Sequence, residues 1–224
     1  MGKEQEKERI IKPNLILCEG KDPKFFIDHY LSYLLRTDKE FDGFQAISFG
    51  GNQELPRFLL EFSTYPDFDQ VVSIIVLRDA EDNFEVAVQA VQNALNKAGF
   101  PVPKEANAVA NGIVNSKNMK AAFSLFPSLS CKKADGTVED LYWNNLKEEG
   151  IDWVKNEILT FLDTVCAQGR SMPRMHKTKL HSYFSVTDKY LTMKIGEATK
   201  AGAFDFECTE MLSLKELLLS IIEN

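Results

Sequence analysis

In the first half of the chain, short apolar runs alternate with stretches whose apolar residues recur at helical spacing. Runs of strand length cover residues 14–18, 44–49 and 71–77, and the last run, VVSIIVL, is β-branched and almost continuous. Such a run is typical of a strand that is covered on both faces. Between the first two runs, apolar residues at i, i+4 spacing predict an amphipathic helix that begins near Asp22 and Pro23. These residues are Phe26, Ile27, Tyr30, Leu31, Leu34 and Leu35.

Further helices and strands continue this alternation. A helix that includes Leu55 and Phe62 follows the second run, and residues 84–98 form another helical stripe that Gly99 ends. Residues 109–114 and 121–126 are further strand candidates. Strands that alternate with helices predict an α/β fold with a doubly wound, mainly parallel, Rossmann-like sheet flanked by helices.

The final third of the chain has a different, mostly helical pattern. The predicted helices cover residues 139–149, 152–167, 176–186 and 212–222. No Gly/Ser/Pro-rich linker separates them from the first part. We therefore expect a flexible N-terminus (1–12), an α/β domain (13–150) and a helical extension packed on that domain (151–224).

Composition and charge narrow the class of protein. The chain has 224 residues, of which 44% are hydrophobic and 26% charged, as in ordinary globular proteins. Its net charge of −7 argues against a protein that coats nucleic acid by bulk charge. A local basic patch, or carboxylates that hold a metal, remain compatible with that charge.

The sequence also predicts the compartment. No run approaches the roughly 18 apolar residues of a membrane span, and the charged N-terminus lacks the apolar region of a secretory signal. The four cysteines form no C-x-x-C pair, and Cys18 lies in an apolar run as a buried free thiol would. We expect a cytoplasmic protein without membrane contact, and the sequence leaves its oligomeric state undetermined.

Acidic residues follow two of the predicted parallel strands. Glu19 directly follows the first strand, and Asp79 and Glu81 directly follow the third. Open parallel sheets bind ligands at the carboxyl ends of their strands, and residues two apart on an extended segment point to the same side. Three carboxylates that converge there would repel one another without a cation, and Mg²⁺ binds such oxygen ligands.

These motifs resemble the Toprim domain, the metal-dependent α/β module of topoisomerases, bacterial primases, recombination proteins and overcoming-lysogenization-defect nucleases. The resemblance rests on LILCEGKD (15–22), a strand that ends in Glu-Gly, and IIVLRDAED (74–82), a strand that ends in Asp-x-acid. Within this superfamily the chain looks most like small uncharacterised bacterial Toprim-like proteins. FSLFPSLSCKKADGTVEDL (123–141) and KLHSYFSVTDKYLTMKIGEATKAGAFDF (179–206) support that likeness, which covers roughly residues 14–222.

The resemblance implies a role for each acid. Glu19 matches the Toprim glutamate, a general acid/base or metal contact, and Asp79 matches the first Mg²⁺-binding aspartate. Glu81 stands where the family has its second aspartate, so Asp82 in a shifted register is an alternative ligand. In related nucleases a later acidic pair adds to the metal site; Glu139 and Asp140 are that pair here, with Glu139 as the candidate ligand, and acids at a helix N-terminus are the alternative interpretation. The implied cofactor is Mg²⁺ or Mn²⁺.

Other interpretations of these residues stay open. The acids at the strand ends could simply cap the helices that follow, and Asp22 fits an N-cap better than a ligand. Gly50-Gly51 could offer amides to a phosphate, but lacks a P-loop context and favours an ordinary turn. Arg78 could neutralise the acids when metal is absent.

One segment of the acidic chain is basic. It contains Arg170, Arg174, His176, Lys177, Lys179 and His181, beside Tyr183 and Phe184. Lysine and arginine contact phosphates and aromatic rings stack on bases, so Arg174, Lys177 and Lys179, together with Lys21, are candidate substrate contacts. A solvated helix face is the alternative interpretation.

Two functions follow as expectations. The first is a Mg²⁺-dependent Toprim-type protein that acts on the phosphodiesters of DNA or RNA, as a nuclease or nucleotidyl transferase. The second is a catalytically weak or inactive binding module for nucleic acid, a nucleotide or a protein partner. Whether the chain is an enzyme is left open by the departure at Glu81.

Overall fold

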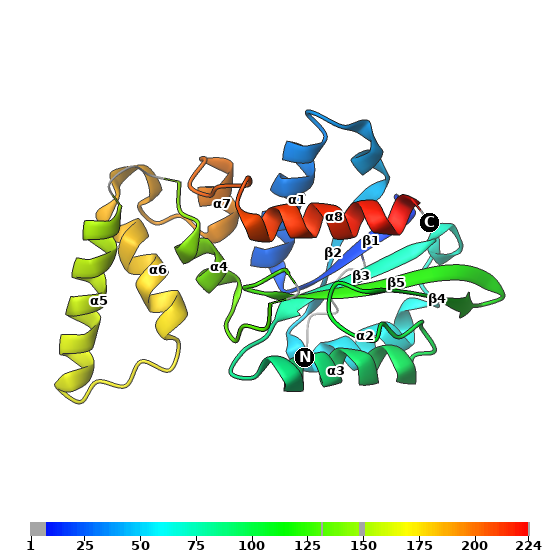
Figure 1. The fold of residues 1–224 in the computed structure, drawn as a ribbon, viewed down its shortest axis with the longest axis horizontal. Coiled ribbons are helices and arrows are strands. Elements are labelled where there is room, and N and C mark those ends of the chain that lie inside the picture. The colour runs from blue at the N-terminus through cyan, green and yellow to red at the C-terminus, as the bar shows by residue number, and fades with distance from the viewer. Residues whose placement is uncertain (1–7, 131, 148–150, 224) are drawn as a thin grey trace, which may run out of the picture.

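A five-stranded sheet forms the centre of the computed structural model (Figure 1), which describes residues 8–130, 132–147 and 151–223. The strands are β1 (Asn14–Glu19), β2 (Phe44–Gly50), β3 (Ser73–Asp79), β4 (Val109–Val114) and β5 (Lys117–Phe126). Their order is β2-β1-β3-β5-β4; β2, β1, β3 and β5 run parallel, and β4 is antiparallel to β5. The expected α/β fold with a mainly parallel sheet is confirmed.

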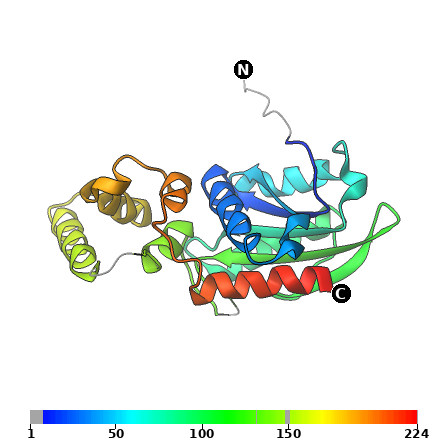
Figure 2. The same ribbon diagram turned by 90° about the horizontal axis from the view of Figure 1, so that it is seen from above.

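Helices cover both faces of this sheet. They are α1 (Lys21–Leu34), α2 (Leu55–Phe62), α3 (Phe84–Lys97), α4 (Val138–Asn144), α5 (Asp152–Ala167), α6 (Met175–Val186), α7 (Ile195–Lys200) and α8 (Thr209–Glu223). Helices α1 and α8 pack on one face, and α2 and α3 pack on the other (Figures 1 and 2). Among the described residues, no helix combines the length and the apolar composition that crossing a bilayer requires.

The two cores arise from the period-two pattern of the strands. In β1, Ile16 and Cys18 belong to the core with α1 and α8, whereas Leu15 and Leu17 belong to the core with α2 and α3. Alternate strand residues point to opposite faces, so a continuous apolar run is what a doubly covered strand needs. Cys18 is fully buried and free, as expected, and burial raises the pKa of its thiol.

The strand predicted over residues 121–126 begins earlier than its apolar residues indicate. Strand β5 starts at Lys117 and pairs with β4 across a two-residue turn of Asn115 and Ser116, both with positive φ. Asparagine adopts this left-handed conformation more readily than most residues, and such turns match the twist of a hairpin. Residues 117–120 contain a single apolar residue, Met119, which is too little hydrophobic alternation to reveal the strand.

The helix expected over 139–149 is shorter than predicted. Helix α4 ends at Asn144, and the chain then pairs with a distant segment: Lys147 donates to the Ala203 carbonyl, and Asp205 donates to the Asn145 carbonyl. These bonds flank an antiparallel bridge between Leu146 and Phe204. This tertiary pairing therefore replaces helical structure at residues 145–147. Residues 148 and 149 of the predicted helix lie outside the described part of the chain. Cys131 also lies outside it.

The C-terminal helices occupy two places. Helices α5 and α6 pack on each other beside the sheet, with α6 against α4, whereas α8 returns to lie along the sheet (Figures 1 and 2). Its Met211, Leu214 and Leu218 join the core that contains Ile16. The chain thus uses its last described helix to close the face of the sheet that α1 begins.

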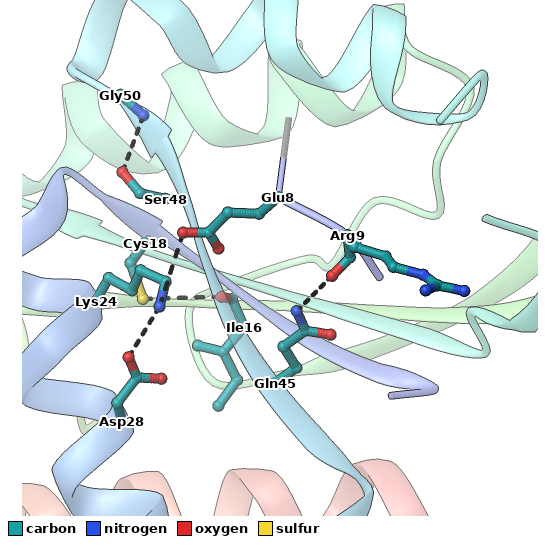
Figure 3. A network of polar contacts seen from close by, with 9 residues as sticks. All are labelled: Glu8, Arg9, Ile16, Cys18, Lys24, Asp28, Gln45, Ser48 and Gly50. Atoms are coloured by element: carbon teal, nitrogen blue, oxygen red, sulfur yellow. Dashed lines mark hydrogen bonds and ion pairs between the residues drawn. The ribbon is translucent and has the colours of Figure 1, made fainter. Parts of the chain in front are cut away.

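The segment before β1 is tied to the sheet domain in its described part. Ile10 is 1% exposed in the core with α2 and α3. The Gln45 side chain donates to the Arg9 carbonyl, and Lys24 of α1 pairs with Asp28 at 2.9 Å and with Glu8 (Figure 3). Residues 8–12 are therefore anchored to β2 and α1, and residues 1–7 lie outside the described part.

Replacing Tyr30 by Phe tests the attachment of α8. The buried Tyr30 hydroxyl donates to the Met211 carbonyl and thereby joins α1 to the start of α8. Loss of this hydrogen bond should lower the free energy of unfolding by roughly 1 kcal/mol, measured by denaturant titration. Tyr33→Phe, which removes an exposed hydroxyl bonded to Glu207, is the matched control and should cost less. Equal losses in both variants would contradict the assignment.

Candidate functional site

The candidate site lies where the order of the sheet reverses. Strand β1 has β2 on one side and β3 on the other, so the chain crosses from one side of β1 to the other between β2 and β3. Ligands bind in the crevice outside the carboxyl ends of the strands at such a switch point. Glu19 is the last residue of β1, and Asp79 is the last residue of β3.

Three predicted acids converge at this point. Glu19, Asp79 and Glu81 each offer a carboxylate oxygen, and these oxygens lie within 4.8 Å of one another. Glu19 and Asp79 are half-buried, whereas Glu81 is exposed. The structure therefore brings together the three residues that the sequence predicts at one edge of the sheet.

Glu81 reaches the cluster by a different backbone path from the one expected. The segment after Asp79 is not extended, because Glu81 has a φ of 55° in the left-handed region. Its amide donates to the Gly136 carbonyl at 2.8 Å, and the Gly136 amide donates back to the Glu81 carbonyl at 2.7 Å. This two-bond exchange holds Glu81 beside Asp79, and Ala80 is buried in the core with α2 and α3.

The Asp79 carboxylate is under electrostatic stress. Burial raises its pKa well above the usual value, and repulsion from Glu19, Glu139 and Glu81 raises it further. One interaction opposes this shift: the Val138 amide, at the N-terminus of α4, donates to Asp79 Oδ1 at 2.9 Å. The ionised form of Asp79 is thus held at a cost that a nearby cation would offset.

Arg78 supplies one resident cation. Its Nε atom lies 3.6 Å from Glu19 Oε2 and donates to the Asp79 carbonyl, and the side chains of Arg78 and Glu19 are only 8% and 11% exposed. Arg78 therefore balances the charge of Glu19 and does not pair with the Asp79 carboxylate. Arg78 was expected to neutralise the acids together, but it neutralises only Glu19 in the cluster.

A second cation comes from α6. Lys177 Nζ lies 3.1 Å from Glu139 Oε1, and the Glu139 side chain is 5% exposed. The neighbouring pair is separate: Lys179 lies 2.6 Å from Asp140 Oδ1 and over the Trp143 ring. The two adjacent acids of α4 thus bind two lysines of α6.

A cavity of about 440 Å³ opens in front of the acids. Its lining includes all three acids and Glu139, and also the predicted substrate contacts Lys21, Arg174 and Lys177. Further lining residues are Gly20, Asp22, Pro23, Gly50, Gly51, Thr137, Val138, Pro173 and His176. Among the described residues, the lining does not contain Lys179, whose ammonium group is engaged by Asp140 instead.

Glu19, Asp79 and Glu81 do not cap the helices that follow their strands, as the alternative interpretation expected. Helix α3 is capped by Asn83, whose side chain accepts from the Val86 amide, and α1 begins after Gly20 without a side-chain cap. Asp22 therefore lies inside the first turn of α1. Within the described part of the chain, Asp82 joins neither the acid cluster nor the cavity lining.

Sequence reasoning missed the loop that supports the site. Gly136 has a φ of 130°, and a Cβ atom there would lie 2.8 Å from Asp140 Oδ2, so glycine is required. Thr137 and Asp140 form a capping box at the start of α4, and Asp135 accepts from the Phe84 amide of α3. The capping box was readable from the T-x-x-D spacing, whereas the contact with Glu81 has no local signal.

Comparison with known proteins places the chain in a family. Residues 13–223 match the family model described as "Protein of unknown function (DUF3226)". The chain belongs to this family. Comparisons with curated proteins and with solved structures found no match. The matched region of this chain spans the sheet and the C-terminal helices together.

The donor set of this DUF3226 chain fits a hard divalent cation. Opposite oxygens on an octahedral Mg²⁺ lie about 4.2 Å apart, twice the metal–oxygen distance. The 4.8 Å limit on the oxygens of Glu19, Asp79 and Glu81 is therefore close to what one ion would draw together. The cavity that these acids line has room for the water molecules that a bound Mg²⁺ usually keeps.

Replacing Asp79 by Asn should stabilise the metal-free protein at neutral pH. The folded pKa of Asp79 lies above its unfolded value, so its ionisation costs stability. This cost is absent near pH 4 and grows until the pH passes the raised pKa. The asparagine side chain keeps an oxygen for the Val138 amide, so the variant should have the higher melting temperature in EDTA, by circular dichroism. A lower melting temperature at neutral pH would contradict this electrostatic account.

Proposed function

We propose that this DUF3226 chain is a Mg²⁺- or Mn²⁺-dependent, Toprim-type protein that acts on nucleic acid phosphodiesters as a nuclease or nucleotidyl transferase. The observation that carries the proposal is one cavity whose lining has carboxylates from two strand ends and cations from two helices. A phosphodiester needs both groups, because a metal polarises its oxygens and cationic side chains hold its charge.

The residues divide into two sets in this proposal. Asp79 and Glu81 would hold the ion, and Glu19 would transfer a proton to or from the reacting oxygen or contact the metal. The ion would supply charge stabilisation at the phosphoryl oxygen. Lys21 and Arg174, which are exposed and line the same cavity, would bind the phosphates of the strand.

The cavity also supports the choice of substrate. Its positive lining comes from the first turns of α1 and α6, and the acids lie at the strand ends between them. A few local cations of this kind would contact a short stretch of phosphate backbone, which is compatible with a net charge of −7. DNA and RNA both have such a backbone, so the proposed substrate is either of them.

One observation favours the alternative of a binding module without turnover. Glu19 already has Arg78 beside it, and Glu139 has Lys177. Acids that are neutralised by the protein itself need a metal less than free acids do. In this alternative the cavity binds nucleic acid, a nucleotide or a protein partner through Lys21 and Arg174, and divalent ions add little.

Divalent ions should stabilise the protein if the three acids hold one. Binding to the folded state alone raises the free energy of unfolding by about 2.7 kcal/mol at a concentration 100 times the Kd. MnCl₂ or MgCl₂ should therefore raise the melting temperature of the wild type and leave Asp79→Asn unchanged. An unchanged wild type, or an equal rise in the variant, would favour the binding module.

Glu19→Gln tests the mechanism. The substitution keeps the size of the side chain and removes its charge and its capacity as a base. Turnover of labelled single- and double-stranded DNA and RNA with Mg²⁺ or Mn²⁺ should fall by about 10²–10⁴-fold, the usual contribution of a general acid or base. The measurement is the initial rate of product formation on denaturing gels.

Asp82→Asn is the matched control for that experiment. It removes an acid adjacent to Glu81 that lies outside the cluster among the described residues, so its rate should equal that of the wild type. Turnover unaffected by Glu19→Gln would overturn the mechanism. A loss in Asp82→Asn with full activity in a Glu81→Gln variant would move the metal ligand from Glu81 to Asp82.

A further inference from the structure

Glu139 is the acid of the cavity that the three-residue cluster does not include. Its charge nevertheless acts on that cluster, because repulsion from Glu139 contributes to the raised pKa of Asp79. It lies at the start of α4, one residue after the Val138 amide that binds Asp79. Glu139 and the cluster thus belong to one electrostatic unit.

The Glu139 carboxylate is deeply buried and only half satisfied. The residue is 4% exposed, and Oε1 pairs with Lys177 at 3.1 Å. Its other oxygen, Oε2, is buried and has no hydrogen-bond partner among the described residues. A buried ionised oxygen without a donor is costly, and no donor in the described part of the chain fills the coordination position of this atom.

Charge balance shows how many ions the unit can take. Glu19, Asp79, Glu81 and Glu139 contribute four negative charges, and Arg78 and Lys177 each lie beside one of these acids. The remaining charge of −2 equals that of one divalent ion. A second ion would bring an excess of two positive charges, and loss of one resident cation would reduce that excess to one.

The two resident cations differ in their freedom to leave. The Arg78 side chain is 8% exposed and is fixed within β3, whereas the Lys177 side chain is 45% exposed in the first turn of α6. Lysine has a flexible stem and a single ammonium group, which moves more readily than a buried guanidinium. Lys177 is therefore the cation that can be exchanged.

We propose that Lys177 occupies a second cation position beside Glu139, so that the wild-type chain binds one divalent ion and a second ion binds only when the ammonium group is removed. This inference rests on the metal site of the proposed function, since the first ion is the one held by Glu19, Asp79 and Glu81. Glu139 would be the main protein ligand of the second ion, through the Oε1 atom that Lys177 pairs with in the wild type and through Oε2.

Counting bound Mn²⁺ in Lys177→Met tests the inference without any activity assay. Free Mn²⁺ has a strong electron paramagnetic resonance signal that is lost on binding, so a titration gives the number of ions per chain. We expect one ion in the wild type and two in Lys177→Met, with magnetic coupling between neighbouring ions in the variant. Lys177→Gln should behave in the same way, and circular dichroism checks that each variant is folded.

Two further variants locate the second ion. Adding Glu139→Gln to Lys177→Met should return the count to one, because the proposed ligand is lost. Lys179→Met is the matched control: it removes the neighbouring lysine of α6, which binds Asp140 outside the cavity lining, and should leave the count at one. A second ion in Lys179→Met would contradict the special role of Lys177.

The outcomes separate this inference from the proposed function. One ion in both the wild type and the Lys177 variants overturns the inference and leaves the metal site of the proposed function intact. Two ions in the wild type do the same, because Lys177 then blocks nothing. No bound ion in the wild type overturns both.

Discussion

Repulsion among the carboxylates that meet at the ends of β1 and β3 is the constraint on which the rest of this site depends. The doubly wound sheet places the ends of β1 and β3 side by side, and both strands end in an acid. The surrounding groups answer that repulsion: Arg78 lies beside Glu19, and the Val138 amide binds Asp79. The loop between β5 and α4 brings that amide to the site through its pairing with Glu81. Fold and site are thus joined by electrostatics as much as by packing.

The sequence predicts the part of the site that depends on the sheet alone. Continuous apolar runs imply parallel strands, and the ends of parallel strands share an edge, so Glu19 and Asp79 were predictable as neighbours. The partners that come from outside the sheet were not. Lys177 meets Glu139 across 38 residues, and the left-handed Glu81 is held by Gly136. Such contacts depend on how loops and helices pack, which no local pattern records.

The helical part shows the same division. The bounds of α5 and α6 agree closely with the predicted ranges 152–167 and 176–186. The region after Asn144 departs from its prediction, because backbone pairing with residues 203–205 outweighs helical propensity there. The composition of the basic segment predicts a phosphate-binding surface. Two of its lysines instead neutralise Glu139 and Asp140, which leaves Arg174 as the exposed cation of that segment at the cavity, among the described residues.

The return of α8 to the sheet has a consequence for how the chain folds during synthesis. Ile16 of β1 and Ile75 of β3 share a core with Leu214 and Leu218 of α8. Ile16 and Leu214 are about two hundred residues apart in the sequence. Residues 209–223 leave the ribosome long after β1 does. Until then, the part of this sheet face that α8 covers beside α1 is exposed. The apolar face that Ile16 and Ile75 present therefore stays partly exposed until α8 has emerged and packed on it.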